Sequence, residues 1–220
     1  DVREYLTHIT GGFGEPLSFG ERLAQYMRGR IHEYDVVHDN QTLCWGLLKV
    51  QATGLPVAGT IHHPITRDRA IAVAAAENWK IRLLVRRWYS FLSMQKKVAR
   101  RLDPVIVVSE STKRDVVQEF GVDLARMRTV LHGINADQYR PIPGIERRNN
   151  RIMTVASADV PLKGLVYLIR AYAQLLPTYP DLELLVVGKL REGPTMKLLD
   201  ELGIRDRVRF ISGLSDEEVT

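Results

Sequence analysis

Cysteine is almost absent from this sequence. The single cysteine, Cys44, cannot form a disulfide within the chain, which is typical of proteins from a reducing compartment. No apolar run approaches the roughly 20 residues that a membrane span requires, and no basic segment followed by an apolar one opens the chain. We therefore expect a cytoplasmic protein that is neither membrane-spanning nor secreted.

Common metal and nucleotide motifs are also missing from the sequence. None of the six histidines forms an H-x-x-x-H pair or joins Cys44 at the spacing of a zinc site. The nearest approach to a D-x-D pair, residues 181–183, opens a predicted strand and suits ordinary surface charge. A Walker A loop and a G-x-G-x-x-G turn are both absent. We expect no bound metal and no cofactor.

Positive charge is concentrated in one segment. The net charge is +5, but residues 78–102 contain no acid and carry +8, which leaves −3 for the rest. A helix over 79–102 would place these basic residues on one side and apolar residues on the other. This pattern has two explanations. The helix packs against the core and its basic face is simply solvated, or its basic face binds an anionic membrane or an anionic acceptor. We expect no nucleic acid, because no nucleic-acid-binding module is recognisable. The basic residues are Lys80, Arg82, Arg86, Arg87, Lys96, Lys97, Arg100 and Arg101.

Apolar runs alternate with amphipathic segments along the whole chain. This rhythm indicates strands and helices of parallel α/β sheets. It is interrupted at 139–150, where proline, glycine and polar residues gather. We predict two Rossmann-like domains, residues 1–140 and 151–220, joined by a linker at 141–150. The predicted strands cover 34–38, 56–61, 104–109, 128–131, 151–156, 182–188 and 208–212.

Both ends of the sequence suggest a fragment. Ser215 and Glu218 form a capping box for a helix that has only two more residues, and no first strand follows Asp1. We expect both domains to be truncated.

One loop has the pattern of a phosphate site. The stretch VASADVPLKG, residues 155–164, connects a predicted strand to a predicted helix. Gly164 allows the backbone to approach a ligand, the helix N-terminus offers free N–H groups, and Lys163 adds a full positive charge. A plain strand-to-helix turn with a solvated lysine would give the same pattern.

The order and spacing of the segments resemble glycosyltransferase family 4, whose members are retaining, nucleotide-sugar-dependent enzymes of GT-B fold. The resemblance covers nearly the whole chain from Tyr34 onward. It implies that the first domain binds the acceptor, that the second binds the donor, and that transfer occurs between them without a metal ion. The segments that carry it are YDVVHDNQT, GLPVAGTIHHP, VIVVSESTKRDVVQEFGV, VLHGINADQYRP, VASADVPLKGLVYLIRAYAQL and LELLVVGK.

The resemblance also implies donor-binding residues. Lys163 and Gly164 would contact the donor diphosphate, and Ser157 stands where many members have an arginine. A hydroxyl donates one hydrogen bond but supplies no charge. Either Lys163 and the helix N-terminus suffice, or Lys189 or Arg191 supplies the second charge.

Further donor-side residues are expected near the ends of the last two predicted strands. Gly188 precedes the two candidate cations. The backbone around Phe210 and Gly213, in VRFISG, would approach the nucleotide base.

On the acceptor side, the resemblance singles out His62. It follows AGTI, where members often place a histidine near the donor sugar, and it would position the sugar or the acceptor rather than act as a general base. His38, Asp39 and Asn40 close the preceding strand and could either line the acceptor side or cap the next helix. His63 should face away from His62, because successive strand residues point to opposite faces.

The sequence thus predicts a retaining glycosyltransferase with a nucleoside-diphosphate sugar as donor and an unidentified acceptor. Alternatives are another GT-B activity, such as a sugar-nucleotide epimerase, or a catalytically silent protein that binds a sugar nucleotide or an anionic membrane. Two glutamates spaced E-x7-E in active members would lie after Thr220, so we expect this chain alone to be inactive. The basic segment would allow peripheral association with the inner face of a membrane.

Overall fold

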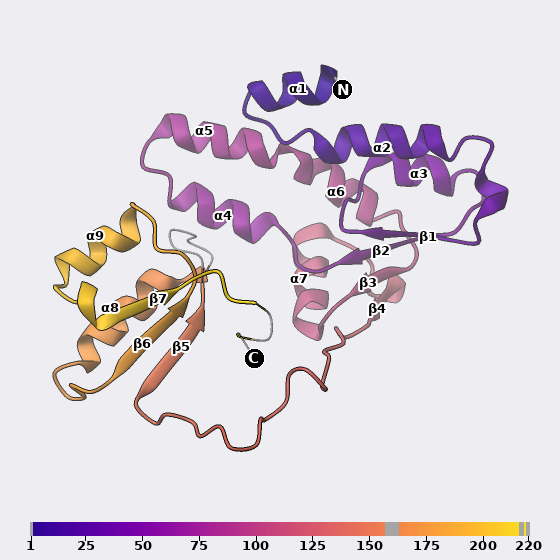
Figure 1. Cartoon of the computed structure of the whole chain (residues 1–220). Coiled ribbons are helices and arrows are strands. Elements are labelled where there is room, and N and C mark those ends of the chain that lie inside the picture. The colour runs from indigo at the N-terminus through magenta and orange to yellow at the C-terminus, as the bar shows by residue number, and fades with distance from the viewer. Residues whose placement is uncertain (1, 157–162, 216–217, 219–220) are drawn as a thin grey trace. The chain divides into compact units, whose positions relative to one another are not determined.

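The chain folds into two α/β units, each with a parallel sheet (Figure 1). The structure is a computed structural model that describes residues 2–156, 163–215 and 218. The units are Asp1–His132 and Gly133–Thr220, so the proline- and glycine-containing segment 139–150 lies in the second unit. The predicted fold class is confirmed, and the predicted domain limits stay a prediction.

The sheet of the first unit has four parallel strands in chain order. These are β1 (Val37–Asn40), β2 (Val57–Ile61), β3 (Val105–Val107) and β4 (Met127–Thr129). Each strand pairs in parallel with the next one along the chain. Because the strands run in parallel, their carboxyl ends meet at one edge of the sheet, where residues from distant parts of the sequence become neighbours.

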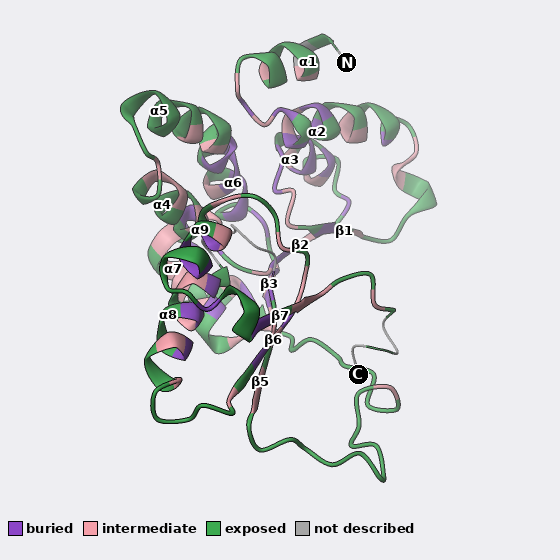
Figure 2. Ribbon diagram, turned by 60° about the vertical axis from the view of Figure 1, so that its left-hand side comes forward, coloured by how far each residue is buried: buried purple, intermediate pink, exposed green. Residues whose placement is uncertain are grey.

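Four helices of the first unit, α2, α3, α6 and α7, pack apolar residues into one core and leave their other sides more exposed (Figure 2). The strand residues Val57, Ile61, Val105 and Val107 are buried in this core. Such burial in a parallel sheet explains why the sequences of β2 and β3 are largely apolar. The helices of this unit are α1 (Val2–Ile9), α2 (Glu15–Tyr26), α3 (Trp45–Gln51), α4 (Thr66–Ala74), α5 (Trp79–Trp88), α6 (Leu92–Ala99) and α7 (Glu110–Phe120).

The prediction of one helix over 79–102 is wrong. α5 and α6 are separated by a 3₁₀ turn at Tyr89–Phe91. A 3₁₀ turn has 3.0 residues per turn instead of 3.6, so the faces of the two helices are rotated relative to each other. Five residues of α6 are buried, whereas α5 has none. A single apolar side therefore does not run along the whole segment, although seven of its eight basic residues are exposed and Lys96 is half-buried.

The second unit has a three-stranded parallel sheet, with β5 (Arg151–Val155), β6 (Glu183–Val187) and β7 (Val208–Ile211) in chain order. Its core contains Leu184 and Val186 from the sheet together with apolar residues of α8 (Leu165–Leu175) and α9 (Pro194–Glu201). Alternate residues of β5, Met153 and Val155, are exposed. The two helices therefore cover one face of this sheet.

None of the described helices combines the length and the hydrophobicity needed to cross a membrane.

Two glycines allow α2 and α3 to approach each other closely. A Cβ atom on Gly46 of α3 would overlap the carbonyl oxygen of Gly20 in α2. A Cβ atom on Gly20 would lie 2.8 Å from the Cβ of Cys44, which precedes α3. Cβ atoms in proteins essentially never lie this close to another heavy atom. Any side chain at either position must therefore push the two helices apart.

We therefore expect Gly46→Ala to destabilise the first unit by about 1–3 kcal/mol, the usual cost of overpacking a well-packed region. The three tryptophans, Trp45, Trp79 and Trp88, all belong to this unit, so denaturant unfolding followed by tryptophan fluorescence measures its stability. Gly133→Ala, directly after the last residue of this unit, is the control, because a Cβ atom there meets nothing within 4 Å. Equal unfolding midpoints for Gly46→Ala and the unmodified chain would contradict the close approach.

Candidate functional site

The candidate site of the first unit lies at the carboxyl edge of its sheet, where ligands bind in open α/β sheets. His38, Asp39 and Asn40 belong to β1, and His62 directly follows β2. The structure brings Asn40 and His62 together with His132, a residue that the sequence analysis did not single out. His132 comes three residues after the end of β4, so its position beyond a predicted strand was the available signal.

The ring of His62 is held on both of its nitrogen atoms. Its Nε2 lies 2.6 Å from Oδ1 of Asn40, and its Nδ1 lies 3.3 Å from Nε2 of His132. The rings of His62 and His132 are stacked, with centroids 5.2 Å apart and planes 11° from parallel. We call Asn40, His62 and His132 the His62 cluster.

The surroundings favour the neutral form of His62. Burial lowers the pKa of its imidazole, and the neighbouring His132 and His63 lower it further. A positive charge there would lose part of its hydration. At neutral pH, His62 is therefore an uncharged group that can donate one hydrogen bond and accept another.

His63 has a different environment from its neighbour. Its Nε2 lies 3.1 Å from Oδ2 of Asp68, in the first turn of α4. His62 and His63 thus contact separate partners, as expected for successive residues at the end of a strand.

Asp39 and His38 form hydrogen bonds with residues outside the His62 cluster. Asp39 is only 5% exposed, and its carboxylate accepts hydrogen bonds from the Thr42 hydroxyl and, at 2.9 Å, from the backbone N–H of Leu43. Burial raises the pKa of the Asp39 carboxyl group, and these hydrogen bonds partly oppose the shift. Nε2 of His38 lies 2.7 Å from Oγ1 of Thr60 on β2. Asp39 orders the loop before α3, and an acceptor-side role for either residue stays a prediction.

The loop between β1 and α3 contains two residues in left-handed backbone conformation, Gln41 with φ 67° and Leu43 with φ 47°. Such conformations cost roughly 1–3 kcal/mol each for non-glycine residues and occur often at functional sites. The side chain of Gln41 accepts a hydrogen bond from the backbone N–H of His62 at 2.7 Å and donates one to the carbonyl of His63 at 3.1 Å. Gln41 therefore fixes the backbone at the end of β2. The sequence analysis missed it because a glutamine in a polar loop carries no distinctive signal.

In the second unit, the predicted phosphate loop leads into α8. Gly164 immediately precedes the helix with φ 67°, a conformation that glycine adopts without strain, and Lys163 is exposed. A Cβ atom at Gly164 would be no closer than 3.7 Å to Tyr167, so backbone conformation rather than space requires the glycine. Ser157 lies outside the described residues.

The other predicted donor-side residues follow β6 and β7. The N–H of Gly188 donates to the carbonyl of Ile211 at 2.7 Å, and Lys189 and Arg191 beyond it are exposed. Phe210 packs against the core from β7, and Gly213 follows that strand with φ 79°. These positions are at or near the carboxyl ends of parallel strands, as a nucleotide site requires. Their roles stay predictions.

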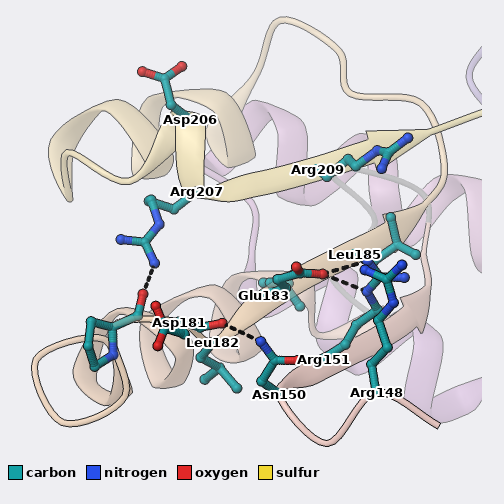
Figure 3. A pocket seen from close by; sticks show the side chains of 12 residues that line it. Arg148, Asn150, Arg151, Asp181, Leu182, Glu183, Leu185, Asp206, Arg207 and Arg209 are labelled. Carbon is teal, nitrogen blue, oxygen red and sulfur yellow. Dashed lines mark hydrogen bonds and ion pairs between the residues drawn. The ribbon is translucent and has the colours of Figure 1, made fainter. Parts of the chain in front are cut away.

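A hollow of about 860 Å³ lies at the opposite, amino-terminal edge of this sheet (Figure 3). Its polar side chains largely contact one another and the backbone: Arg151 pairs with Glu183 at 2.5 Å, and Arg207 donates to the carbonyl of Pro180. The ion pair lowers the pKa of Glu183. Because ligands of α/β sheets bind at the carboxyl edge, we do not assign the donor to this hollow. It is lined by Arg148, Asn150, Arg151, Pro180, Asp181, Leu182, Glu183, Leu184, Leu185, Asp206, Arg207 and Arg209.

Among the residues that the structure describes, no group of three or more histidine, cysteine, aspartate and glutamate side chains is arranged to hold a metal ion.

The lowered pKa of His62 predicts a pH-dependent stability of the first unit. Below about pH 6.5, the unfolded chain protonates this histidine more readily than the folded chain does. Neutral His62 therefore contributes to the stability of the folded unit above the ordinary histidine pKa. This contribution is lost as the pH falls towards the lower pKa that His62 has in the folded chain. His62→Gln should show a smaller loss of stability between about pH 7.5 and pH 5 than the unmodified chain, measured by denaturant unfolding with tryptophan fluorescence. His32→Gln, in an exposed turn, is the control. The same pH dependence with and without His62 would contradict its lowered pKa.

Comparison with known proteins agrees with the sequence resemblance. Residues 2–138 match the family described as Glycosyltransferase Family 4, and residues 136–220 match the one described as Glycosyl transferases group 1. An MMP alpha-(1->4)-mannosyltransferase of Mycolicibacterium hassiacum is 47% identical over the whole chain, which covers 53% of that relative. A phosphatidyl-myo-inositol mannosyltransferase of Mycolicibacterium smegmatis is 23% identical over 94% of the chain and 52% of the relative. The chain thus spans about half the length of these relatives.

Solved structures show the same fold. HepE of Anabaena, in complex with UDP and glucose, superimposes with a TM-score of 0.60 at 19% identity, over 92% of this chain and 53% of HepE. TarM gives a TM-score of 0.61 at 12% identity, over 90% of this chain and 36% of TarM. The match of residues 2–138 covers more than half of the sequence. The chain therefore belongs to glycosyltransferase family 4.

Proposed function

We propose that the protein is a retaining glycosyltransferase, of the mannosyltransferase kind, that uses a nucleoside-diphosphate sugar without a metal ion. The observation that carries the proposal is the His62 cluster at the carboxyl edge of the first sheet, in a chain of this family. The 47% identical relative is a mannosyltransferase, and HepE was solved with UDP and glucose. Both support the sugar-transfer chemistry.

On the donor side, the second unit would bind the diphosphate at the start of α8. The helix N-terminus carries about half a positive charge, and Lys163, which is exposed, immediately precedes Gly164 at this terminus. Fixed cations of this kind stabilise a phosphate leaving group as negative charge develops on it. Lys189 or Arg191 would add a second charge if one lysine is insufficient.

On the acceptor side, the first unit would present His62. Its neutral imidazole can donate a hydrogen bond to a hydroxyl of the transferred sugar or of the acceptor, in place of its contact with Asn40. His38 and Asn40 lie on β1 at the same edge and would contribute to acceptor binding.

A membrane surface is a second proposal, and α5 carries it. Trp79 is 69% exposed and Leu83 is 60% exposed, one helical turn apart. Arg82 and Arg86 occupy the same side of the helix, since residues three and four apart are neighbours on a helix surface. Aromatic and aliphatic side chains between cations suit an anionic lipid surface, where each arginine or lysine contributes about 1 kcal/mol.

We expect Lys163→Ala to weaken the binding of a nucleotide sugar by roughly 10- to 100-fold, because charge-assisted hydrogen bonds contribute about 1.5–3 kcal/mol. Calorimetry with GDP-mannose and UDP-glucose would measure this in a protein extended past Thr220 to the length of the relatives. Lys197→Ala, on the exposed side of α9, is the matched control. Unchanged affinity in Lys163→Ala, beside an intact control, would remove this loop from the donor site.

The membrane proposal predicts sedimentation with anionic vesicles. A variant with Trp79→Ala, Leu83→Ala, Arg82→Glu and Arg86→Glu should no longer sediment with vesicles of phosphatidylcholine and phosphatidylglycerol. Added salt should weaken the binding of the unmodified chain, since charges are screened beyond about 8 Å at physiological ionic strength.

Arg28→Glu with Arg114→Glu reverses two exposed charges on other elements of the first unit and is the control for net charge. Equal sedimentation of the α5 variant and the unmodified chain would show that α5 is not the membrane surface. Binding to vesicles of phosphatidylcholine alone would exclude an electrostatic origin.

A further inference from the structure

The stacked contact between His62 and His132 has a chemical consequence for the site. We propose that His132 is a positioning residue that holds His62 in the tautomer with its proton on Nε2. The proposal goes beyond the family's sequence pattern, because it assigns a task to a second imidazole at the boundary of the first unit.

The position of each proton follows from the two contacts of the His62 ring. Oδ1 of Asn40 can only accept a hydrogen bond, so the Nε2 atom of His62, 2.6 Å away, carries the proton. A neutral imidazole has one N–H, which leaves Nδ1 of His62 as an acceptor. The facing Nε2 of His132, at 3.3 Å, must then carry the proton that it donates. The proton order is thus fixed along Asn40, His62 and His132.

The backbone of His62 is held by other residues, so His132 acts on the ring alone. The N–H of His62 donates to the Gln41 side chain at 2.7 Å, and its carbonyl accepts from the Thr112 hydroxyl at 3.1 Å. Loss of the His132 imidazole would leave the strand end in place. Nδ1 of His62 could then take up a second proton, or it could carry the single proton in place of Nε2.

The other ionisable groups at this edge are engaged elsewhere. His38 contacts Thr60, His63 contacts Asp68 of α4, and Glu110 at the start of α7 accepts from Thr129 at 2.5 Å. The carboxylate of Asp39 accepts hydrogen bonds from Thr42 and Leu43 in the loop that follows β1. Within the described residues, the ring nitrogens of His62 have hydrogen-bond contacts with Asn40 and His132 only, so no carboxylate stabilises a second proton on the ring.

The fixed tautomer makes His62 a hydrogen-bond donor rather than a base on the side that faces Asn40. An oxygen atom that replaces Oδ1 of Asn40 would receive the Nε2 proton. This step alone rests on the proposed function. If that function holds, the oxygen atom belongs to a hydroxyl of the transferred sugar or of the acceptor.

The tautomer can be read by NMR without any activity. Long-range ¹H–¹⁵N spectra of the histidine rings, recorded on this chain through a pH titration, should show the proton of neutral His62 on Nε2. His132→Phe keeps an aromatic ring but removes the donor, so His62 should become a mixture of tautomers and titrate at higher pH. His132→Gln restores an N–H donor and should restore the Nε2 form. His32→Gln controls for the loss of an unrelated histidine.

Two results would overturn the proposal. One is a proton on Nδ1 of His62 in the unmodified chain, which does not depend on whether any variant folds. The other is a folded His132→Phe variant in which the tautomer and the titration of His62 equal those of the unmodified chain.

Kinetics of the protein at the length of its relatives provide an independent readout. His132→Phe should lower kcat/KM by roughly 2- to 10-fold, the contribution of one neutral hydrogen bond, and should shift the acidic limb of the pH profile upwards. His132→Gln should recover both. If the unmodified protein transfers no sugar from any donor, the proposed function fails, and the NMR result still decides the role of His132.

Discussion

The side-chain amide of Gln41 joins the ends of two neighbouring strands, and the candidate site of the first unit depends on it. Its oxygen and nitrogen bind the backbone on either side of the His62–His63 peptide bond. To reach them, Gln41 adopts a left-handed backbone conformation. Gln95 of α6 stabilises the strained loop by donating to the carbonyls of Gln41 and Thr42. Local strain is thus balanced by hydrogen bonds to the residues that follow β2 and from α6.

Much of the architecture was predictable from the sequence. The apolar runs predicted each of the seven strands of the described residues, although the predicted range 34–38 shares only Val37 and His38 with β1, and the interruption at 139–150 separated two sheets. These features are local, because a strand that is buried in a parallel sheet is itself rich in apolar residues. The family resemblance singled out His62, and the loop before a predicted helix singled out Lys163; their roles stay predictions. The tandem order of the elements, rather than any single motif, identified the family.

Other features could not be predicted because they depend on contacts between distant residues. His132 is 70 positions from His62, and nothing in its own segment indicates a stacked partner. The break between α5 and α6 depends on how Phe91 packs: it is 6% exposed and meets Phe13 edge-to-face at 5.4 Å. A helical wheel assumes a constant rotation per residue and cannot detect such a turn.

The close approach of α2 and α3 links a remote surface of the first unit to its site. Cys44 lies against Gly20 and immediately precedes α3, so it also ends the strained loop that begins at Gln41. A displacement of α2 would therefore displace the loop residues that orient His62. Substitutions along this helix can consequently change the geometry of the His62 cluster without contacting it, and variation at positions 20 and 46 should be correlated among homologous proteins.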